Sequence, residues 1–451
     1  MKRLEQVVAS PFVPRWRPTA TVLLPVACGV LAAIAIALQS WPALAVLLGI
    51  SVALVVPVEF AFGLLALAVP FDTVTTLGSS GLTLSFAVSA ASGGILLAKI
   101  LAGGRVAAPP RALPWFVLFF LWAAMSTLWA LDPSLSTKRL PAAAALTALY
   151  VVAVILQITE RELRTVGQMI VFGGTVAAAV SLYQFAMGVN VAGRASIVFG
   201  AVATNSNELA ASLILPVSLA VGGVLSSRGW RRGLAVAAVV LMLLCTLLTM
   251  SRGGLVALAA MAAVYFYRQG TDKRLIAVLA CATALILVAP DLLMTRMQEA
   301  LSSRAQGRLD IWLVGMEVVK HYGAFGVGLD NFPLAFQQYA GRQMVFRAFS
   351  TVPHNIYLQA IAETGLLGFF LLIGALRAQM KDIARTIRGA RDSATAWIVP
   401  YEAAAWGIII QGMVANLLWR KMFWLVWIVV ALAVQVAKRN TGTHAETLNA
   451  G

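Results

Sequence analysis

The chain has 451 residues, of which 60% are hydrophobic and 12% are charged, and its mean hydropathy is +0.86. Charged residues make up about a quarter of an ordinary soluble domain, so this composition excludes a soluble globular protein. The net charge of +16 could suggest a nucleic-acid partner. However, Lys and Arg concentrate in alternate loops between apolar segments, which indicates membrane topology and argues against nucleic-acid binding.

Apolar segments long enough to cross about 30 Å of hydrocarbon as helices recur along the chain. They lack the two-residue alternation of an outer-membrane barrel. We therefore predict an all-α fold, a polytopic transmembrane bundle of about 12 helices, with a range of roughly 12–14. The predicted spans are 20–38, 42–57, 59–76, 83–101, 114–130, 138–157, 165–187, 205–226, 233–250, 253–268, 273–290, 354–379, 397–417 and 419–438.

The spans divide the chain into four parts. Transmembrane helices occupy 1–290, a long periplasmic loop 291–352, C-terminal transmembrane helices 353–438 and a cytoplasmic tail 439–451. The basic loops place both termini in the cytoplasm of a bacterial cell, with the protein passing many times through the inner membrane.

The long loop contains a predicted surface helix between Arg308 and His321. Its apolar residues recur at helical spacing and form one stripe that could lie on the membrane. These residues are Leu309, Trp312, Leu313, Met316 and Val319. A glycine-rich segment at 323–328 then ends the helix, and its simplest interpretation is a loop.

Basic residues on the predicted periplasmic side form the first candidate site. Snorkelling to lipid phosphates explains any one of them. Convergence from several helices favours a pyrophosphate site instead, because arginine matches phosphate oxygens and helix N-termini carry partial positive charge. The residues are Lys138, Arg139, Arg194, Arg252, Arg308, Arg420 and Lys421.

His354 is the second candidate, because it opens an apolar helix directly after the long loop. We expect Ser350 or Thr351 to cap that helix, with Pro353 in its first turn. The helix dipole then disfavours imidazolium and leaves the neutral imidazole that a general base requires. The alternative is a histidine hydrogen-bonded at the membrane interface. His321 is expected to be solvated.

No paired-carboxylate spacing, Cys/His metal spacing or phosphate loop is present in the sequence. We therefore predict no metal and no cofactor. A bond-forming step outside the inner membrane then needs a donor that is already activated. A polyprenyl pyrophosphate glycan is such a donor, because pyrophosphate leaves well when its charge is neutralised.

Four sequence motifs together resemble the superfamily of bacterial O-antigen ligases, O-antigen polymerases and O-oligosaccharyltransferases. The most specific begins at His354-Asn355 and continues with Leu358, Glu363, Gly365 and Gly368. The others, in family order, are Asn205-Ser206-Asn207-Glu208-Leu209-Ala210, Ser251-Arg252-Gly253-Gly254, and Arg308-Leu309-Asp310-Ile311-Trp312 followed by Gly326-Val327-Gly328-Leu329-Asp330-Asn331-Phe332. The resemblance covers about 190–380.

The resemblance implies transfer of a glycan from undecaprenyl pyrophosphate to lipid A core at the periplasmic face, among membrane lipids. It implies that His354 is the catalytic base that deprotonates the acceptor hydroxyl. Arg194, Arg252 and Arg308 would hold the pyrophosphate, Arg252 as a catalytic residue, and Asn207 would orient a substrate. Asn355, Lys138 and Arg139 complete the expected substrate-binding set. Glu363 is expected to be structural, bonded to a neighbouring helix.

We favour an O-antigen ligase, since the His354 motif follows a single long loop and Arg420 and Lys421 could contact core phosphates. An O-antigen polymerase and a protein O-oligosaccharyltransferase are the nearest alternatives. A transporter or lipid flippase is an alternative of another class. Transporters usually place charges at mid-membrane depth, whereas most charges here lie near one surface, apart from Glu402 and Glu363.

Overall fold

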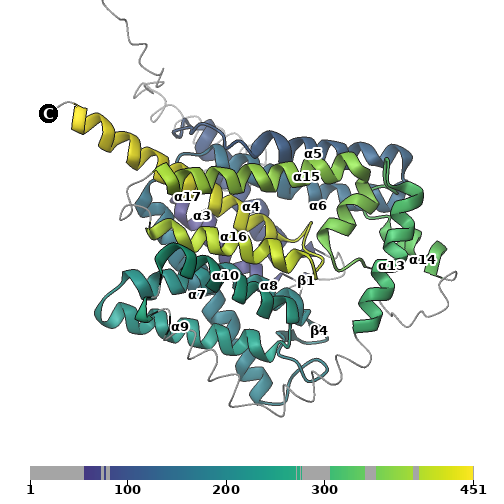
Figure 1. Cartoon of the computed structure of the whole chain (residues 1–451), viewed down its shortest axis with the longest axis horizontal. Coiled ribbons are helices and arrows are strands. Elements are labelled where there is room, and N and C mark those ends of the chain that lie inside the picture. Colours follow the sequence, from purple (N-terminus) through teal and green to yellow (C-terminus); the bar gives the residue numbers. More distant parts are fainter. Residues whose placement is uncertain are drawn as a thin grey trace, which may run out of the picture.

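The computed structural model describes residues 55–72, 76–77, 82–270, 272–274, 276, 305–340, 352–389 and 396–449. Figure 1 shows these residues as a bundle of long helices, many of them side by side. The helices are α3 (Val58–Ala68), α4 (Leu84–Leu101), α5 (Leu113–Met125), α6 (Pro133–Ile155), α7 (Glu160–Ala186), α8 (Ser206–Ser226), α9 (Gly229–Leu248), α10 (Arg252–Gln269), α13 (Ala305–Tyr322), α14 (Phe332–Ala340), α15 (Ile356–Gly389), α16 (Val399–Gly412) and α17 (Lys421–Asn449).

Short elements join these helices. They are the 3₁₀ helices η1 (Val69–Phe71), η3 (Ser126–Trp129) and η5 (Ala396–Ile398), and the strands β1 (Thr76–Leu77), β2 (Leu82–Thr83), β3 (Val198–Phe199) and β4 (Val202–Ala203). The strands pair as two separate antiparallel hairpins, β1 with β2 and β3 with β4. The predicted all-α class is therefore confirmed.

Six of the described helices are long and apolar enough to cross a membrane: α6, α7, α8, α9, α15 and α17. Shorter apolar helices cover Val58–Phe71, Ala87–Leu101 and Leu113–Trp129. These features are those of a polytopic helical membrane protein. The predicted span 20–38, and most of 42–57 and 273–290, lie outside the described residues.

Side-chain caps explain where several helices begin. Asp132 accepts a hydrogen bond from Ser134 N at the start of α6, and Thr159 with Glu162 forms a capping box at the start of α7. Asn205 caps α8 through Asn207 N, and Ser251 caps α10 through Gly254 N. Each cap satisfies backbone N–H groups that the helix itself leaves without partners.

Helix α17 forms the centre of the bundle. Within its apolar window 89% of residues are buried, including Trp424 and Trp427. It packs against α6, α15 and α16. A helix that is apolar all round belongs in the interior, which explains its position. The helix continues through Asn449, so most of the predicted tail at 439–451 is helical.

Helices α13 and α14 form a second, smaller core at one end of the bundle. Ile311, Val314 and Val318 of α13 pack against Phe332 and Phe336 of α14. The prediction of a helix between Arg308 and His321 is confirmed. Leu313 and Met316 of the predicted stripe remain exposed, whereas Trp312 and Val319 of the same stripe pack against this small core. Helix α13 is thus apolar on two faces, and its location on a membrane surface stays a prediction.

Helix α15 is interrupted at Gly365, whose φ of 68° and ψ of −173° are non-helical. The glycine-rich segment 323–328 lies against this break. Gly328 N donates to Glu363 O at 2.9 Å and Leu366 N donates to Gly323 O at 2.7 Å. The segment is therefore more than a connecting loop, since it provides partners for backbone groups that the broken helix leaves free.

Glu363 itself is 2% exposed and accepts a hydrogen bond from Gln359 Nε2 at 3.2 Å. Glu363 also accepts a hydrogen bond from the backbone of Asp330, in the segment that precedes α14. Gln359 lies one turn earlier on the same helix, where side chains four residues apart are neighbours.

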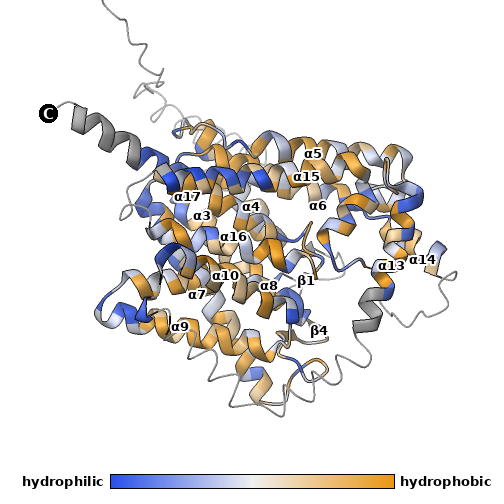
Figure 2. Ribbon diagram, in the orientation of Figure 1, coloured by the Kyte–Doolittle hydropathy of each residue, from blue (hydrophilic) through white to orange (hydrophobic). Residues whose placement is uncertain are grey.

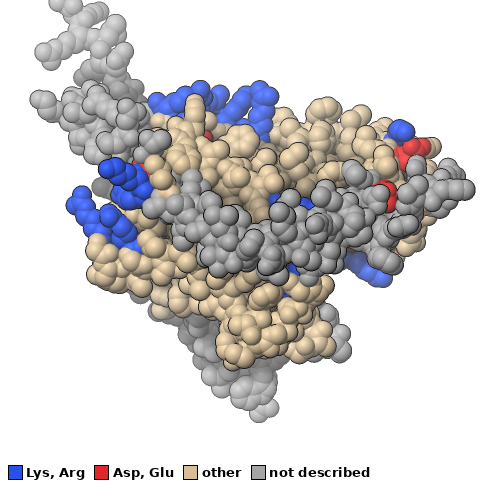
Figure 3. Space-filling view, turned by 60° about the horizontal axis from the view of Figure 1, so that its bottom comes forward, with Lys and Arg blue, Asp and Glu red and all other residues tan. Residues whose placement is uncertain are grey.

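The ends of the bundle differ in charge. Figure 3 shows Lys and Arg gathered over the left half of the molecule, with a broad uncharged surface beside them. That half contains the end of α15 and the start of α9, whereas α8, α15 and α17 begin toward the opposite end (Figure 1). This distribution is the one that the positive-inside rule associates with a single side of a membrane.

Candidate functional site

Four loops contain the non-glycine residues of positive φ among the described residues: Ala192 (51°), Met250 (53°), Asp330 (62°) and His354 (48°). Left-handed backbone is uncommon for residues other than glycine, and such strain concentrates at functional sites. Each strained residue lies in or within two positions of a predicted motif residue. The strain and the motifs therefore identify the same region.

His354 precedes α15 and does not belong to it. The helix begins at Ile356, and Asn355 Oδ1 accepts hydrogen bonds from Tyr357 N at 2.9 Å and Leu358 N at 3.1 Å. The predicted cap at Ser350 or Thr351 was wrong, and so was Pro353 in the first turn. His354 has a positive φ, so the helix does not extend back through it to Pro353. Asn355 instead supplies the acceptor that a cap needs. Asn355 thus has a structural role besides its predicted one.

The backbone next to His354 is held by the surface helix. Trp312 Nε1 of α13 donates to Pro353 O at 3.2 Å. Leu358 packs against Gly315, where an added Cβ would approach Leu358 Cδ2 to 2.7 Å. The motif that ends at Trp312 therefore positions His354. The Arg308 side chain lies outside the described part of the structure, so its predicted contact with pyrophosphate stays a prediction.

Arg194 connects three predicted motif segments. Its Nε donates to Thr249 O at 2.7 Å, and its Nη2 donates to Asn207 Oδ1 at 2.9 Å. The first bond reaches the turn before Arg252, and the second reaches the first turn of α8. These two bonds fix the orientation of the guanidinium between the two segments.

Arg252 is the first residue of α10 and its side chain is exposed. The next residue, Gly253, lies directly on α16, because an added Cβ would be 2.2 Å from Val414 Cγ2 and 2.7 Å from Gln411 Oε1. Only glycine permits this approach. Gln411 Nε2 in turn donates to Asn207 O at 3.3 Å. Gly253, which follows Arg252, and Asn207 therefore contact the same residue of α16.

The start of α15 contacts this same end of α16. Tyr357 Oη donates to Ile409 O at 3.0 Å, and an added Cβ on Gly412 would be 2.6 Å from Ile356 Cδ1. Helix α16 thus joins the His354 segment to the segment of Asn207 and Arg252. Sequence reasoning missed Gln411 because no motif surrounds it.

Lys138 and Arg139 differ in their exposure to solvent. Lys138 is exposed, whereas Arg139 is half-buried and its Nη2 lies 3.5 Å from Trp419 O. Arg139 also faces Asp330, as does Arg420. Burial raises the pKa of Asp330, and these two guanidinium groups partly offset that rise.

Arg420 and Lys421 have carboxylate partners. Arg420 Nη2 lies 2.7 Å from Glu208 Oε1, and Lys421 pairs with Asp72. The prediction that these two residues would be available to phosphate groups of the substrate is not supported, because their charge is already balanced. Sequence alone did not reveal the pairs, since the partners are distant in the chain.

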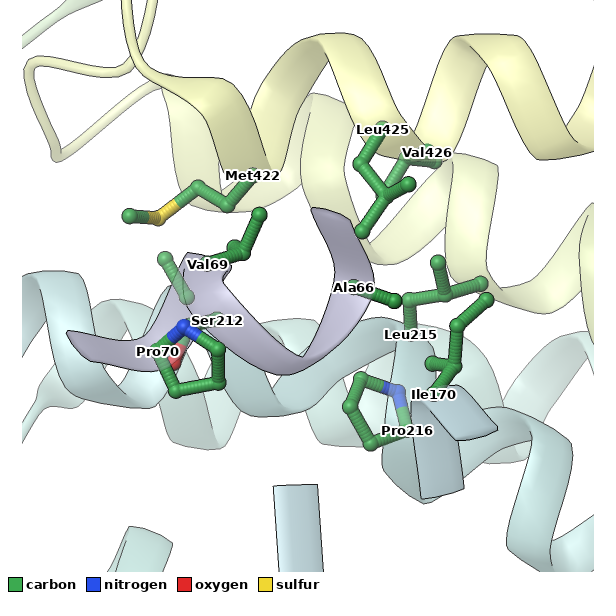
Figure 4. A pocket seen from close by; sticks show the side chains of 11 residues that line it. Ala66, Val69, Pro70, Ile170, Ser212, Leu215, Pro216, Met422, Leu425 and Val426 are labelled. Carbon is green, nitrogen blue, oxygen red and sulfur yellow. The ribbon is translucent and has the colours of Figure 1, made fainter. Parts of the chain in front are cut away.

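A small cavity lies next to these ion pairs. Figure 4 shows it between η1, α8 and α17, with apolar side chains such as Val69, Leu215 and Met422 around it. Its volume of about 10 Å³ holds one water at most. It therefore cannot hold a sugar or a lipid chain in this conformation.

Among the described residues, no three His, Cys, Asp or Glu side chains gather as metal ligands would. The fold and the site together define an integral membrane protein of helices with a polar, strained site where several helices begin. Residues 237–373 match the family model described as O-antigen ligase, which supports a relationship to that family over this part of the chain. No curated protein matches the chain in sequence.

The matched range contains Arg252, Arg308, His354 and Glu363, and ends within α15. Arg194 and Asn207 lie before it. The bond from Arg194 to Thr249 connects them to the matched range.

Proposed function

We propose that the protein is an O-antigen ligase that transfers O-polysaccharide from undecaprenyl pyrophosphate to lipid A core at the periplasmic face of the inner membrane. The observation that carries the proposal is the convergence on the end of α16. Gln411 contacts Asn207, Gly253 packs against Gln411, and Tyr357 contacts Ile409. Segments distant in sequence thus bring a histidine and two arginines to one end of a membrane bundle.

In the proposed reaction, His354 takes the proton from an acceptor hydroxyl. The acceptor oxygen then attacks the anomeric carbon of the donor sugar, and the bond from that carbon to the pyrophosphate oxygen breaks. Undecaprenyl pyrophosphate leaves with the electron pair, and Arg194 and Arg252 stabilise its charge. Attack opposite the leaving group inverts the anomeric carbon.

Backbone geometry supports the role of His354. The residue is held in left-handed conformation between the Trp312 bond to Pro353 and the Asn355 cap. A base must be held within hydrogen-bond reach of the proton that it removes. Constraint on both sides of His354 serves that requirement.

Lipopolysaccharide from a strain that lacks the gene tests the proposal. We expect lipid A core without O-chain, together with lipid-linked polymer. Core with a single repeat unit would identify a polymerase instead, and loss of glycan from a protein would identify an O-oligosaccharyltransferase. Transfer by purified protein in the presence of a chelator tests the predicted metal independence separately.

A further inference from the structure

Buried polar atoms without partners gather at the candidate site. The described residues contain twelve buried side-chain N or O atoms that make no hydrogen bond. Five of them lie where α6, α8, α15 and α16 meet the turn before α17. They are Arg139 Nε, Glu208 Oε2, Gln359 Oε1, Gln411 Oε1 and Trp419 Nε1. Buried polar groups are normally paired, so such a concentration requires an explanation.

Hydrogen bonds and an ion pair connect four of these residues. Gln411 donates to the carbonyl of Asn207, and Glu208 follows Asn207 in the chain. Glu208 pairs with Arg420 at 2.7 Å. The preceding residue, Trp419, has its carbonyl 3.5 Å from Arg139 Nη2.

Further contacts connect Arg139 to Gln359, and Gln359 to the segment of Gln411. Arg139 lies within electrostatic reach of Glu363, which accepts the hydrogen bond from Gln359 at 3.2 Å. Gln359 lies one turn after Ile356, which packs against Gly412, the neighbour of Gln411. We call the five residues that carry the unpartnered atoms the polar ring. Figure 2 shows hydrophilic stretches beside α8 and α16 in a bundle that is otherwise largely apolar.

Reversing the amide groups does not remove the unpartnered atoms. In Gln411 the reversed group would place Oε1 against the Asn207 carbonyl, and in Gln359 it would place Oε1 against the Glu363 carboxylate. Two acceptors would then face each other. The free oxygens of both glutamines are therefore a property of the packing, and both side chains are at least nine-tenths buried, with exposures of 3% and 0%.

We propose that the polar ring binds the hydroxyl groups of a sugar beside the reacting bond, an inference that rests on the proposed function. The unpartnered atoms comprise three acceptors and two donors. A sugar hydroxyl both donates and accepts, so it fits this mixture, whereas phosphate supplies acceptors alone and hydrocarbon supplies neither. Gln359 N donates to Asn355 O at 2.9 Å, which places this member of the ring one helical turn after Asn355, the neighbour of His354.

Binding requires a local rearrangement, because the five atoms are closed to solvent in this structure. The segment 413–420 between α16 and α17 contains Trp419 and has no helix or strand. Its displacement would uncover the ring without unfolding a helix.

Two leucine variants test the proposal, Gln359→Leu and Gln411→Leu. The matched control is Gln379→Leu, because Gln379 is also fully buried on α15 and has an unpartnered Nε2, but lies toward the other end of the helix. The ligands are undecaprenyl-pyrophosphate-linked O-polysaccharide and lipid A core. Each is titrated alone against purified protein, so that binding is measured without transfer.

Loss of one neutral hydrogen bond weakens binding by about tenfold. We expect a rise of that size in the Kd of one ligand for both ring variants and unchanged values for the control. The affected ligand shows whether the ring holds the donor or the acceptor sugar, and Gln411→Glu, which retains an acceptor oxygen, should restore part of the affinity. Unchanged Kd values, or the same change in Gln379→Leu, would overturn the inference. Absence of transfer with these Kd shifts present would contradict the proposed function alone.

Discussion

The contact between the break in α15 and segment 323–328 gives a strong stability prediction. Gly365 has a φ of 68° and a ψ of −173°, a region that is essentially restricted to glycine. A Cβ at this position would lie 2.4 Å from Ala324 O and 2.7 Å from Phe325 C. Gly365→Ala therefore introduces both backbone strain and a collision with main-chain atoms, which cannot rotate away.

The magnitude follows from these two terms. Forcing a non-glycine residue into this conformation costs about 1–3 kcal/mol. Overpacking costs about 1–3 kcal/mol more. We expect Gly365→Ala to lower the free energy of unfolding by about 2–6 kcal/mol in total. If segment 323–328 moves away instead, the hydrogen bonds from Gly328 N to Glu363 O and from Leu366 N to Gly323 O are lost, which is also destabilising.

Denaturant unfolding of purified protein in detergent, followed by tryptophan fluorescence, measures the effect. Gly94→Ala is the matched control, because a Cβ there has nothing within 4 Å and the position is inside α4. Alanine in a helix is favoured over glycine by about 1 kcal/mol, so the control should unfold at the same denaturant concentration or a higher one. Equal midpoints for the two variants would refute the argument about the break.

Three further predictions concern the surroundings of the site. Asn331 is fully buried and bonds to Ser136 Oγ, Leu329 O and the backbone of Asp132. Asn331→Ala should therefore lower the free energy of unfolding by about 2–4 kcal/mol. An unchanged unfolding midpoint would contradict this prediction. Hydrogen bonds from Ser134 lower the pKa of Asp132 below 3.8 in the folded protein. The stabilisation by the ionised Asp132 carboxylate is therefore present above that pH and is lost as pH falls through the lower folded value. Asp132→Ala should therefore lower the free energy of unfolding at pH 7 and progressively less in acid. Asp132→Asn keeps a capping acceptor and should destabilise less at pH 7. A loss of stability in Asp132→Ala that does not change with pH would be inconsistent with this account. Arg252→Gln should reduce kcat/KM for the lipid-linked donor by about 10²-fold or more while leaving the unfolding midpoint unchanged, and retained kcat/KM would exclude Arg252 from pyrophosphate stabilisation.

Helix positions could be predicted from the sequence because hydrophobic length and capping residues are local properties. The boundaries of α8 and α10 follow closely from Asn205 and Ser251, whose side chains cap the helices directly. The boundary of α15 was wrong because Pro353 suited a first turn, whereas the strained φ of His354 depends on tertiary contacts such as the Trp312 bond.

Charge pairing was less predictable than helix position. No partner for Arg420 or Lys421 is evident in the sequence. In the structure Arg420 pairs with Glu208 and Lys421 pairs with Asp72, and each partner lies more than 200 residues earlier in the chain. Gln411 was missed for a related reason. Its importance comes from contacts with Asn207 and Gly253, and no local pattern marks it.

The glycine-rich segment shows the same limit. Glycines at 323–328 predicted a loop, which is correct as far as local conformation goes. Its partner, the break at Gly365, lies about 40 residues later, and only their mutual contacts show why both need glycine.

The most direct measurement is transfer of glycan from undecaprenyl pyrophosphate to lipid A core by purified protein, with His354→Ala compared with His321→Ala. A general base contributes about 10²–10⁴-fold to rate. We predict a loss of that size for His354→Ala with its unfolding midpoint retained. His321, which is exposed on α13 and bonds to Glu317 O, should be dispensable. Wild-type transfer rates in folded His354→Ala protein would contradict the central claim.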